Sequence, residues 1–184
     1  DMMVESGWDR EKAEAAVIDE IHHNIFWDYI DLVVKFKLSR SEAFNRMRQW
    51  HRDNLRCYVD MVETVKDLAG RGKQLFIISN NPYWGCLFKL EFAGLADMQG
   101  APLFDHIFAT NIVNGCKSST EVWQRALNRL DIDPAEIATI GDNHDEDGVI
   151  PQSLGIGRSF ILDRSSEYPV RCDGRFVYLN DARH

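Results

Sequence analysis

The residues of this sequence that are best suited to chemistry lie in the stretch ATIGDNHDEDGV, residues 138–149. Its acidic side chains, Asp142, Asp145, Glu146 and Asp147, follow a β-branched and apolar run that is typical of a buried strand. Like charges crowded beside an apolar core repel one another, because water screens them poorly there. A solvated acidic loop is the alternative, but it does not explain a carboxylate placed directly on a strand end. Carboxylate oxygens at such a position fit Mg²⁺, which prefers carboxylates, water and substrate phosphate.

A second group of polar residues, Ser79, Asn80 and Asn81, ends the apolar run FII. A hydroxyl and an amide there, helped by backbone N–H groups at the start of the next helix, could hold an oxyanion. The same residue types are common before helices, especially when a proline such as Pro82 follows. Taken alone, this group is better explained as a helix N-cap.

The third candidate is Lys117 in VNGCKSST, which stands just before a predicted helix. A cation is electrostatically disfavoured at a helix N-terminus, so its presence suggests an anion that it neutralises. An exposed loop lysine is the alternative, and it is the better explanation when Lys117 is considered alone.

The elements that carry these residues alternate between strand and helix from residue 57 onward. The predicted strands are QLFIIS, DHIFAT, IATI and SFIL, and a last edge strand follows near RFVYL. Helical stripes lie between them, and the one after Lys117 is expected to be capped by Ser118 with Glu121. Strands alternating with helices predict an α/β fold, a Rossmann-like parallel sheet with helices on both faces. Ligands bind beyond the carboxyl ends of such strands, where all three candidate groups lie.

The first part of the chain has a different texture, since residues 9–55 contain neither Gly nor Pro. Apolar residues at helical spacing predict one helix from Ile18 to Tyr29 and a second one that Ser39 and Glu42 cap. We therefore divide the chain into an all-helical cap subdomain, residues 1–56, and an α/β core, residues 57–184. The tryptophans of the helical part are expected to be mostly core residues; they are Trp8, Trp27 and Trp50.

Composition excludes several classes of protein. The chain is 45% hydrophobic and 27% charged, with a formal net charge of −8, which argues against a nucleic-acid partner. No stretch has the apolar length of a membrane-spanning helix, and no signal peptide pattern opens the sequence. The four cysteines form no C-x-x-C pair, so we expect reduced, mostly buried thiols in a cytoplasmic protein.

In order and spacing, these pieces together resemble the haloacid-dehalogenase (HAD) superfamily of hydrolases over roughly residues 57–165. GDNHDEDGVIPQSLGI is similar to that superfamily's fourth motif, with Asp142 and Asp147 at its two acidic positions. The resemblance implies that the helical part is the inserted cap of such enzymes.

One departure concerns the superfamily's nucleophile, the first Asp of a D-x-D motif that ends the first core strand. The opening DMMVESG is similar to the residues that directly follow that motif, so we expect an upstream segment that carries it. Asp131-Ile-Asp133 falls in a predicted loop, and Asp145-Glu-Asp147 belongs to the acidic motif. A truncated, inactive relative is the alternative.

The resemblance implies a Mg²⁺-dependent phosphohydrolase that acts on a small phosphorylated metabolite through an aspartyl-phosphate. Asp142 would bind Mg²⁺, and Asp147 would bind a metal water or pair with Lys117. Lys117 and Ser79 would hold phosphate oxygens. Asn80 would orient the phosphate or position the nucleophile, and Asn81 would contribute to substrate binding.

Two other functions stay open, a 2-haloacid dehalogenase and a non-catalytic binding or regulatory protein of the same fold. His144 is expected to be simply exposed. The basic residues of the second cap helix would contact an anionic substrate or form a solvated face; they are Arg40, Arg46, Arg48, His51 and Arg52. The sequence predicts no oligomeric state.

Overall fold

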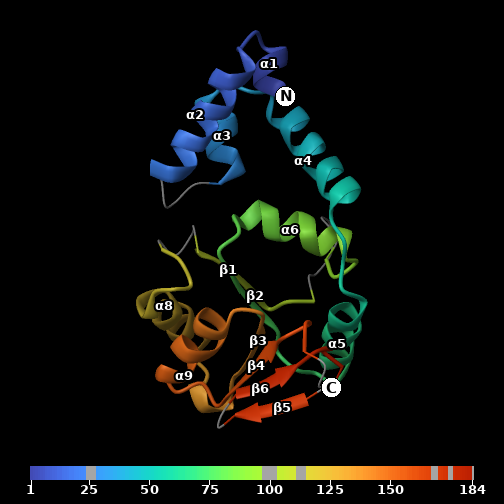
Figure 1. Ribbon diagram of the computed structural model, residues 1–184, viewed down its shortest axis with the longest axis vertical. Coiled ribbons are helices and arrows are strands. Elements are labelled where there is room, and N and C mark those ends of the chain that lie inside the picture. The colour runs from blue at the N-terminus through green and yellow to red at the C-terminus, as the bar shows by residue number, and fades with distance from the viewer. Residues whose placement is uncertain (24–27, 97–102, 111–114, 167–169, 174–175, 184) are drawn as a thin grey trace.

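The computed structural model describes residues 1–23, 28–96, 103–110, 115–166, 170–173 and 176–183. Its first part is all-helical and forms the upper end of the molecule in Figure 1. The helices of this part are α1 (Met2–Glu5), α2 (Arg10–His23), α3 (Tyr29–Lys35) and α4 (Arg40–Asn54). The boundary between cap and core at residues 56 and 57 stays a prediction.

The single helix expected from Ile18 to Tyr29 is wrong, because α2 ends at His23 and α3 begins at Tyr29. Asp28 is the N-cap of α3: its carboxylate accepts a hydrogen bond from the Tyr29 amide, and Asp31 accepts one from the Asp28 amide. This capping box starts a new helix although the apolar spacing continues across it. For α4 the expected N-cap is confirmed, since the Ser39 hydroxyl accepts a hydrogen bond from the Glu42 amide.

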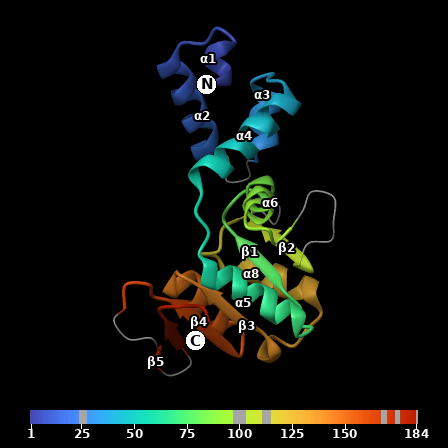
Figure 2. The ribbon, with the colours of Figure 1, turned by 90° about the vertical axis from the view of Figure 1, so that its right-hand side faces the viewer.

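Helix α4 is held against α6 (Tyr83–Phe92), as both ribbon views show (Figures 1 and 2). The Phe44 ring of α4 lies edge-on to Trp84 and Phe88 of α6, with centroids 4.7 and 5.8 Å apart. An ion pair between Arg48 and Glu91, 3.0 Å, lies in the same contact. Aromatic side chains therefore join the helical part to the rest of the molecule.

The remaining elements alternate as the sequence predicts. They are α5 (Val59–Gly70), β1 (Phe76–Ser79), α6, β2 (His106–Ala109), α8 (Thr120–Leu130), η1 (Pro134–Glu136), β3 (Ala138–Gly141), η2 (Asp145–Val149), α9 (Ile150–Ser153), β4 (Arg158–Leu162), β5 (Val170–Asp173) and β6 (Phe176–Leu179). The N-cap of α8 is Ser119, not Ser118, and its hydroxyl accepts from the Glu121 amide. Ser118 instead contacts the thiol of Cys116.

The strands form two separate sheets among the described residues. β1 pairs in parallel with β2, and the other sheet has the order β3-β4-β6-β5. The expected single edge strand at the carboxyl end is wrong: β6 lies inside the sheet, parallel to β4, and β5 is the antiparallel edge. β1 and β3 each keep one edge that no described strand pairs.

Alternate residues of β1 face two different cores. Ile77 packs on a cluster built around Val65 of α5 and Leu90 of α6. Ile78 points the opposite way and packs on Trp123 of α8, together with residues beside β3. Because successive side chains of a strand point to opposite faces, helices cover both faces of β1, and α8 reaches across to the second sheet.

Two burial expectations are wrong. Trp8 and Trp50 are 42% and 56% exposed, and Trp27 lies outside the described residues. All four cysteines are free, as expected, but only Cys86 is buried. Among the described helices, none has the length and apolar character needed to cross a membrane.

Candidate active site

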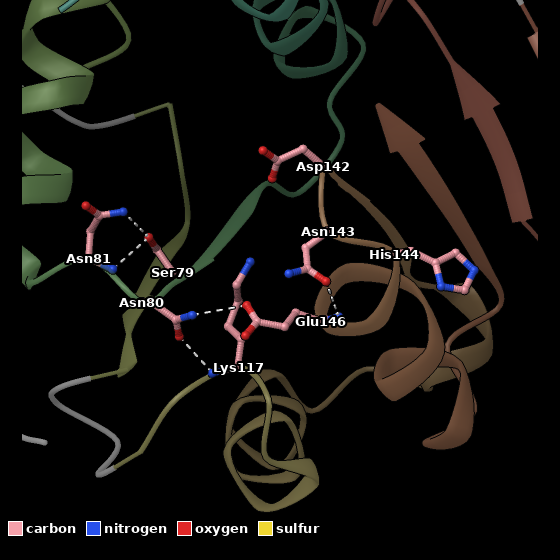
Figure 3. A pocket seen from close by; sticks show the side chains of 8 residues that line it. All are labelled: Ser79, Asn80, Asn81, Lys117, Asp142, Asn143, His144 and Glu146. Atoms are coloured by element: carbon pink, nitrogen blue, oxygen red, sulfur yellow. Dashed lines mark hydrogen bonds between the residues drawn. The ribbon is translucent and has the colours of Figure 1, made fainter. Parts of the chain in front are cut away.

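The carboxyl ends of β1 and β3 open into one pocket of about 620 Å³ (Figure 3). Parallel strands bring their carboxyl ends to the same edge, so Ser79 and Asp142, which are 63 positions apart in sequence, line one pocket. The pocket is lined by Ser79, Asn80, Asn81, Lys117, Asp142, Asn143, His144 and Glu146. Five of the six predicted site residues line it, and the sixth, Asp147, lies directly behind Lys117.

Ser79 ends β1 with its hydroxyl oriented by the next residues. Its oxygen accepts hydrogen bonds from the backbone amide and from the side-chain amide of Asn81, both 3.1 Å long. Lys89 of α6 donates to the other end of the Asn81 amide at 2.6 Å. Two donors on the Ser79 oxygen leave its proton as the one hydrogen that this hydroxyl can donate, and the Cys86 sulfur competes with a ligand for it. Asn81 was expected to bind substrate. Its side-chain amide instead contacts Lys89 through its oxygen and Ser79 through its nitrogen, and so orients the Ser79 hydroxyl.

Asn80 connects the two strand ends. Its Oδ1 accepts from the Lys117 backbone amide at 2.8 Å and from the Thr110 hydroxyl at 3.4 Å. These donors fix the amide so that its Nδ2 points into the pocket, where it donates to Glu146 at 3.1 Å (Figure 3). The predicted role of Asn80 in orienting an anion therefore rests on a fixed NH₂ group.

Lys117 and Asp147 form a short ion pair. The ammonium nitrogen lies 2.6 Å from Oδ1 of Asp147, and the two side chains are only 14% and 7% exposed. The second carboxylate oxygen of Asp147 accepts from the Asn143 amide, and Trp123 donates to the Lys117 carbonyl. Of the two predicted roles of Asp147, metal ligation and pairing with Lys117, the structure has the second.

The Lys117–Asp147 ion pair requires a glycine at position 141. The sequence did not reveal this requirement. A Cβ at residue 141 would lie 2.7 Å from the Cβ of Asp147 and still closer to its carboxyl group. Its backbone has no positive φ, so the need for glycine comes from the space that Asp147 takes.

Asp142 follows Gly141 and has an exposed carboxylate with no hydrogen-bond or ion-pair partner in the described part of the chain. Its side chain faces the pocket (Figure 3). The described part of the chain contains no group of three or more His, Cys, Asp or Glu side chains that could hold a metal ion by themselves. Mg²⁺ fits this donor set, since it is commonly bound by one or two carboxylates, waters and substrate phosphate.

Two further pocket residues come from the acidic turn. His144 stacks on Tyr178 of β6 and packs on Phe176, and its side chain is 45% exposed, so it lies at the rim as expected. Glu146 was not singled out as a site residue. Its side chain reaches the pocket because η2 turns it toward Asn80, and no sequence signal reports such a turn.

The basic residues of α4 that have described partners are engaged away from the pocket. Arg46 pairs with Glu5 and Glu42, and Arg48 pairs with Glu91. His51 is buried and hydrogen-bonded to the Met47 carbonyl. Helix α4 therefore uses its charges within the helical part and on α6.

Comparison with protein families gives one match, to a model described as haloacid dehalogenase-like hydrolase, over residues 3–148. No curated protein matches the chain significantly.

Solved structures share the fold at low sequence identity. The crystal structure of an HAD phosphatase from Thermococcus onnurineus is 22% identical, with a TM-score of 0.63 over 98% of this chain and 81% of that one. An L-2-haloacid dehalogenase from Xanthobacter autotrophicus with chloropropionic acid covalently bound is 19% identical, with a TM-score of 0.53. The match covers 70% of this chain and 48% of that one, so the matched part spans about half the length of the dehalogenase.

A third structure is an HAD family enzyme from Bacteroides thetaiotaomicron, an Asp-to-Ala mutant in complex with magnesium and inorganic phosphate. It is 12% identical, with a TM-score of 0.56 over 90% of this chain and 85% of that one. These likenesses confirm the expected α/β architecture.

Proposed function

The chain belongs to the haloacid dehalogenase-like hydrolases, and we propose that within this family it is a Mg²⁺-dependent phosphohydrolase of a small phosphorylated metabolite. The observation that carries the proposal is Asp142, whose carboxylate has no partner among the described residues and lies in a pocket that also presents Ser79, Asn80 and Lys117. A carboxylate on the order of 5 Å from an anionic substrate repels it by about 3 kcal/mol at an effective dielectric constant of about 20. A divalent cation between them converts that repulsion into attraction, and the Bacteroides relative binds magnesium and phosphate together.

The residues of the pocket have separate tasks in this proposal. The Ser79 hydroxyl and the Lys117 ammonium hold phosphate oxygens as negative charge builds up on them. Asp147 keeps the Lys117 ammonium in place, and the Asn80 NH₂ orients the phosphate. Asp142 would hold Mg²⁺, which screens the approach of an anionic nucleophile to an anionic phosphate.

The covalent step needs a carboxylate nucleophile. A carboxylate oxygen attacks phosphorus, the bond to the leaving oxygen breaks, and a second carboxyl group protonates the departing alkoxide. That second group then takes a proton from the water that attacks phosphorus, which releases phosphate and restores the first carboxylate. In the HAD superfamily both groups come from the D-x-D motif that ends the first core strand.

Among the described residues, β1 and β3 each have one edge that no strand pairs. Both strands end at the pocket, and α8 packs against Ile78 of β1 and Ile137 beside β3, so the two edges belong to one layer. A parallel strand between them would pair both edges and end in the pocket between Ser79 and Asp142.

The experiment that tests the function is hydrolysis of p-nitrophenyl phosphate by the natural protein with Mg²⁺ and with EDTA. We expect EDTA to abolish turnover. Asp142→Asn should do the same and should weaken Mg²⁺ binding measured by calorimetry. Its melting temperature should not change, since an exposed side chain without partners contributes within about 0.5 kcal/mol to stability.

Asp145→Asn is the matched control, because Asp145 loses the same charge three residues away and does not line the pocket. Turnover that survives EDTA and Asp142→Asn would contradict the proposal. The second candidate is a 2-haloacid dehalogenase, which the similarity to the Xanthobacter enzyme favours. Metal-independent chloride release from 2-chloropropionate would select it instead.

A further inference from the structure

The cation of the pocket is already neutralised before any ligand arrives. Lys117 is paired with Asp147, so its positive charge is already balanced by a carboxylate. Asp142 and Glu146 add two carboxylates to the same lining. An anionic ligand therefore meets a site that is acidic on balance, and its binding depends strongly on each donor that the pocket offers.

One of these donors is occupied by the protein itself. The Asn80 amide is fixed by the Lys117 amide and the Thr110 hydroxyl on its oxygen, and its NH₂ group donates to the Glu146 carboxylate at 3.1 Å. The Glu146 side chain extends across the pocket to make this contact (Figure 3). Its carboxylate thus sits where an anion bound to Asn80 would place an oxygen.

The main chain of Glu146 is anchored, whereas its side chain is held by a single hydrogen bond among the described residues. Its amide donates to Oδ1 of Asn143 at 3.0 Å, and the next residue, Asp147, is anchored by Lys117. The Glu146 carboxylate has the Asn80 NH₂ as its partner among the described residues, and the residue is half-buried. Rotation about the side-chain bonds is enough to withdraw the carboxylate from the pocket.

We propose that Glu146 is a tethered anion that competes with the phosphate group of substrate and product for Asn80, and so sets the affinity of the pocket for phosphate. The inference rests on the proposed function, because it takes phosphate as the ligand. A hydrogen bond to a charged group would keep the pocket closed to a competing oxygen about nine-tenths of the time or more. The apparent dissociation constant rises by the inverse of the open fraction, which is about tenfold.

The test measures binding of inorganic phosphate by calorimetry in the presence of Mg²⁺. Glu146→Ala should bind phosphate about tenfold more tightly than the unmodified protein. Glu146→Gln keeps the size and an acceptor oxygen but loses the charge, so it should fall between the two. Asp145→Ala is the matched control: its carboxylate is 82% exposed and outside the pocket, and its affinity should stay within about twofold.

Equal affinity of Glu146→Ala and the unmodified protein, or weaker binding by the variant, would overturn the inference. An equal gain in Asp145→Ala would overturn it too, because general charge would then explain the effect. Absence of phosphate binding by every variant would also overturn it. The proposed function is decided separately, by turnover of p-nitrophenyl phosphate in the unmodified protein.

Discussion

Replacing Gly141 by alanine tests whether the Lys117–Asp147 ion pair depends on the space beside β3. Alanine at a backbone position that it can adopt normally stabilises a protein by about 0.4–1 kcal/mol. Residue 141 has no positive φ, so this gain would apply if nothing were in the way. The new Cβ would instead overlap the Asp147 carboxyl group, and Asp147 would have to leave Lys117 and the Asn143 amide.

The cost of that displacement exceeds the gain. Depriving one member of a buried ion pair of its partner costs about 3–5 kcal/mol, and these side chains are 14% and 7% exposed. The net loss of unfolding free energy should therefore be about 2–4 kcal/mol, or roughly 5–15 °C in melting temperature for a chain of this size. Urea and thermal unfolding followed by circular dichroism measure both quantities.

Gly70→Ala is the control, since Gly70 ends α5 without a positive φ and a Cβ there meets nothing within 4 Å. It should leave stability unchanged or raise it by up to about 1 kcal/mol. In an Asp147→Gly background, which removes the Cβ of residue 147 as well as its carboxyl group, Gly141→Ala should cost far less. A cost that persists there in full would refute the collision with Asp147 as the cause.

Three further substitutions test contacts outside the pocket. Burial raises the pKa of Asp60, but the Ala182 amide and the Arg164 guanidinium outweigh it and hold that pKa below its usual value. The stability that Asp60 contributes is thus complete above about pH 4 and is lost as the pH falls through its lowered pKa. Arg164→Met should therefore move the acid-unfolding midpoint to higher pH. An unchanged midpoint would show that Arg164 is not what lowers the pKa of Asp60. Phe44→Ala should cost about 2 kcal/mol in urea unfolding, because the half-buried ring joins α4 to α6. Glu91→Gln should cost at most about 1 kcal/mol, as expected for a partly exposed ion pair, and the reverse order would contradict the aromatic contact as the main one.

The gathering of Ser79, Lys117, Asp142 and Asp147 could be predicted from sequence because it depends on topology alone. Apolar runs of strand length, separated by helical stripes, require a parallel sheet, and a parallel sheet brings its carboxyl ends to one edge. The residue types alone were not enough, because Ser79 and Lys117 taken singly were better explained as an N-cap and a loop lysine. Their order along the chain, similar to that of the HAD superfamily, predicted that they form one site.

The partners within the pocket could not be predicted in the same way. Whether Asp147 faces a metal or Lys117 depends on the direction of one side chain in η2, and the requirement for Gly141 follows from that direction. Glu146 was missed for the same reason.

The errors in the helical part come from local competition between signals. Apolar spacing continues through Asp28, yet its side chain caps a new helix and breaks the pattern. Ser118 and Ser119 are chemically equal candidates for a cap, and the backbone decides between them. Trp8 and Trp50 are exposed because a small four-helix unit has more surface than core for its large side chains.

The aromatic contact between α4 and α6 has a consequence for protein engineering. Helix α6 begins four residues after Ser79 and carries Trp84 and Phe88, on which Phe44 rests. Helix α6 thus packs against the helical part through its outer face, and its first residue follows closely after the pocket residues of β1. Transplanting a helical part from a relative therefore requires the matching face of α6 as well, so that α4 and α6 form the unit of exchange.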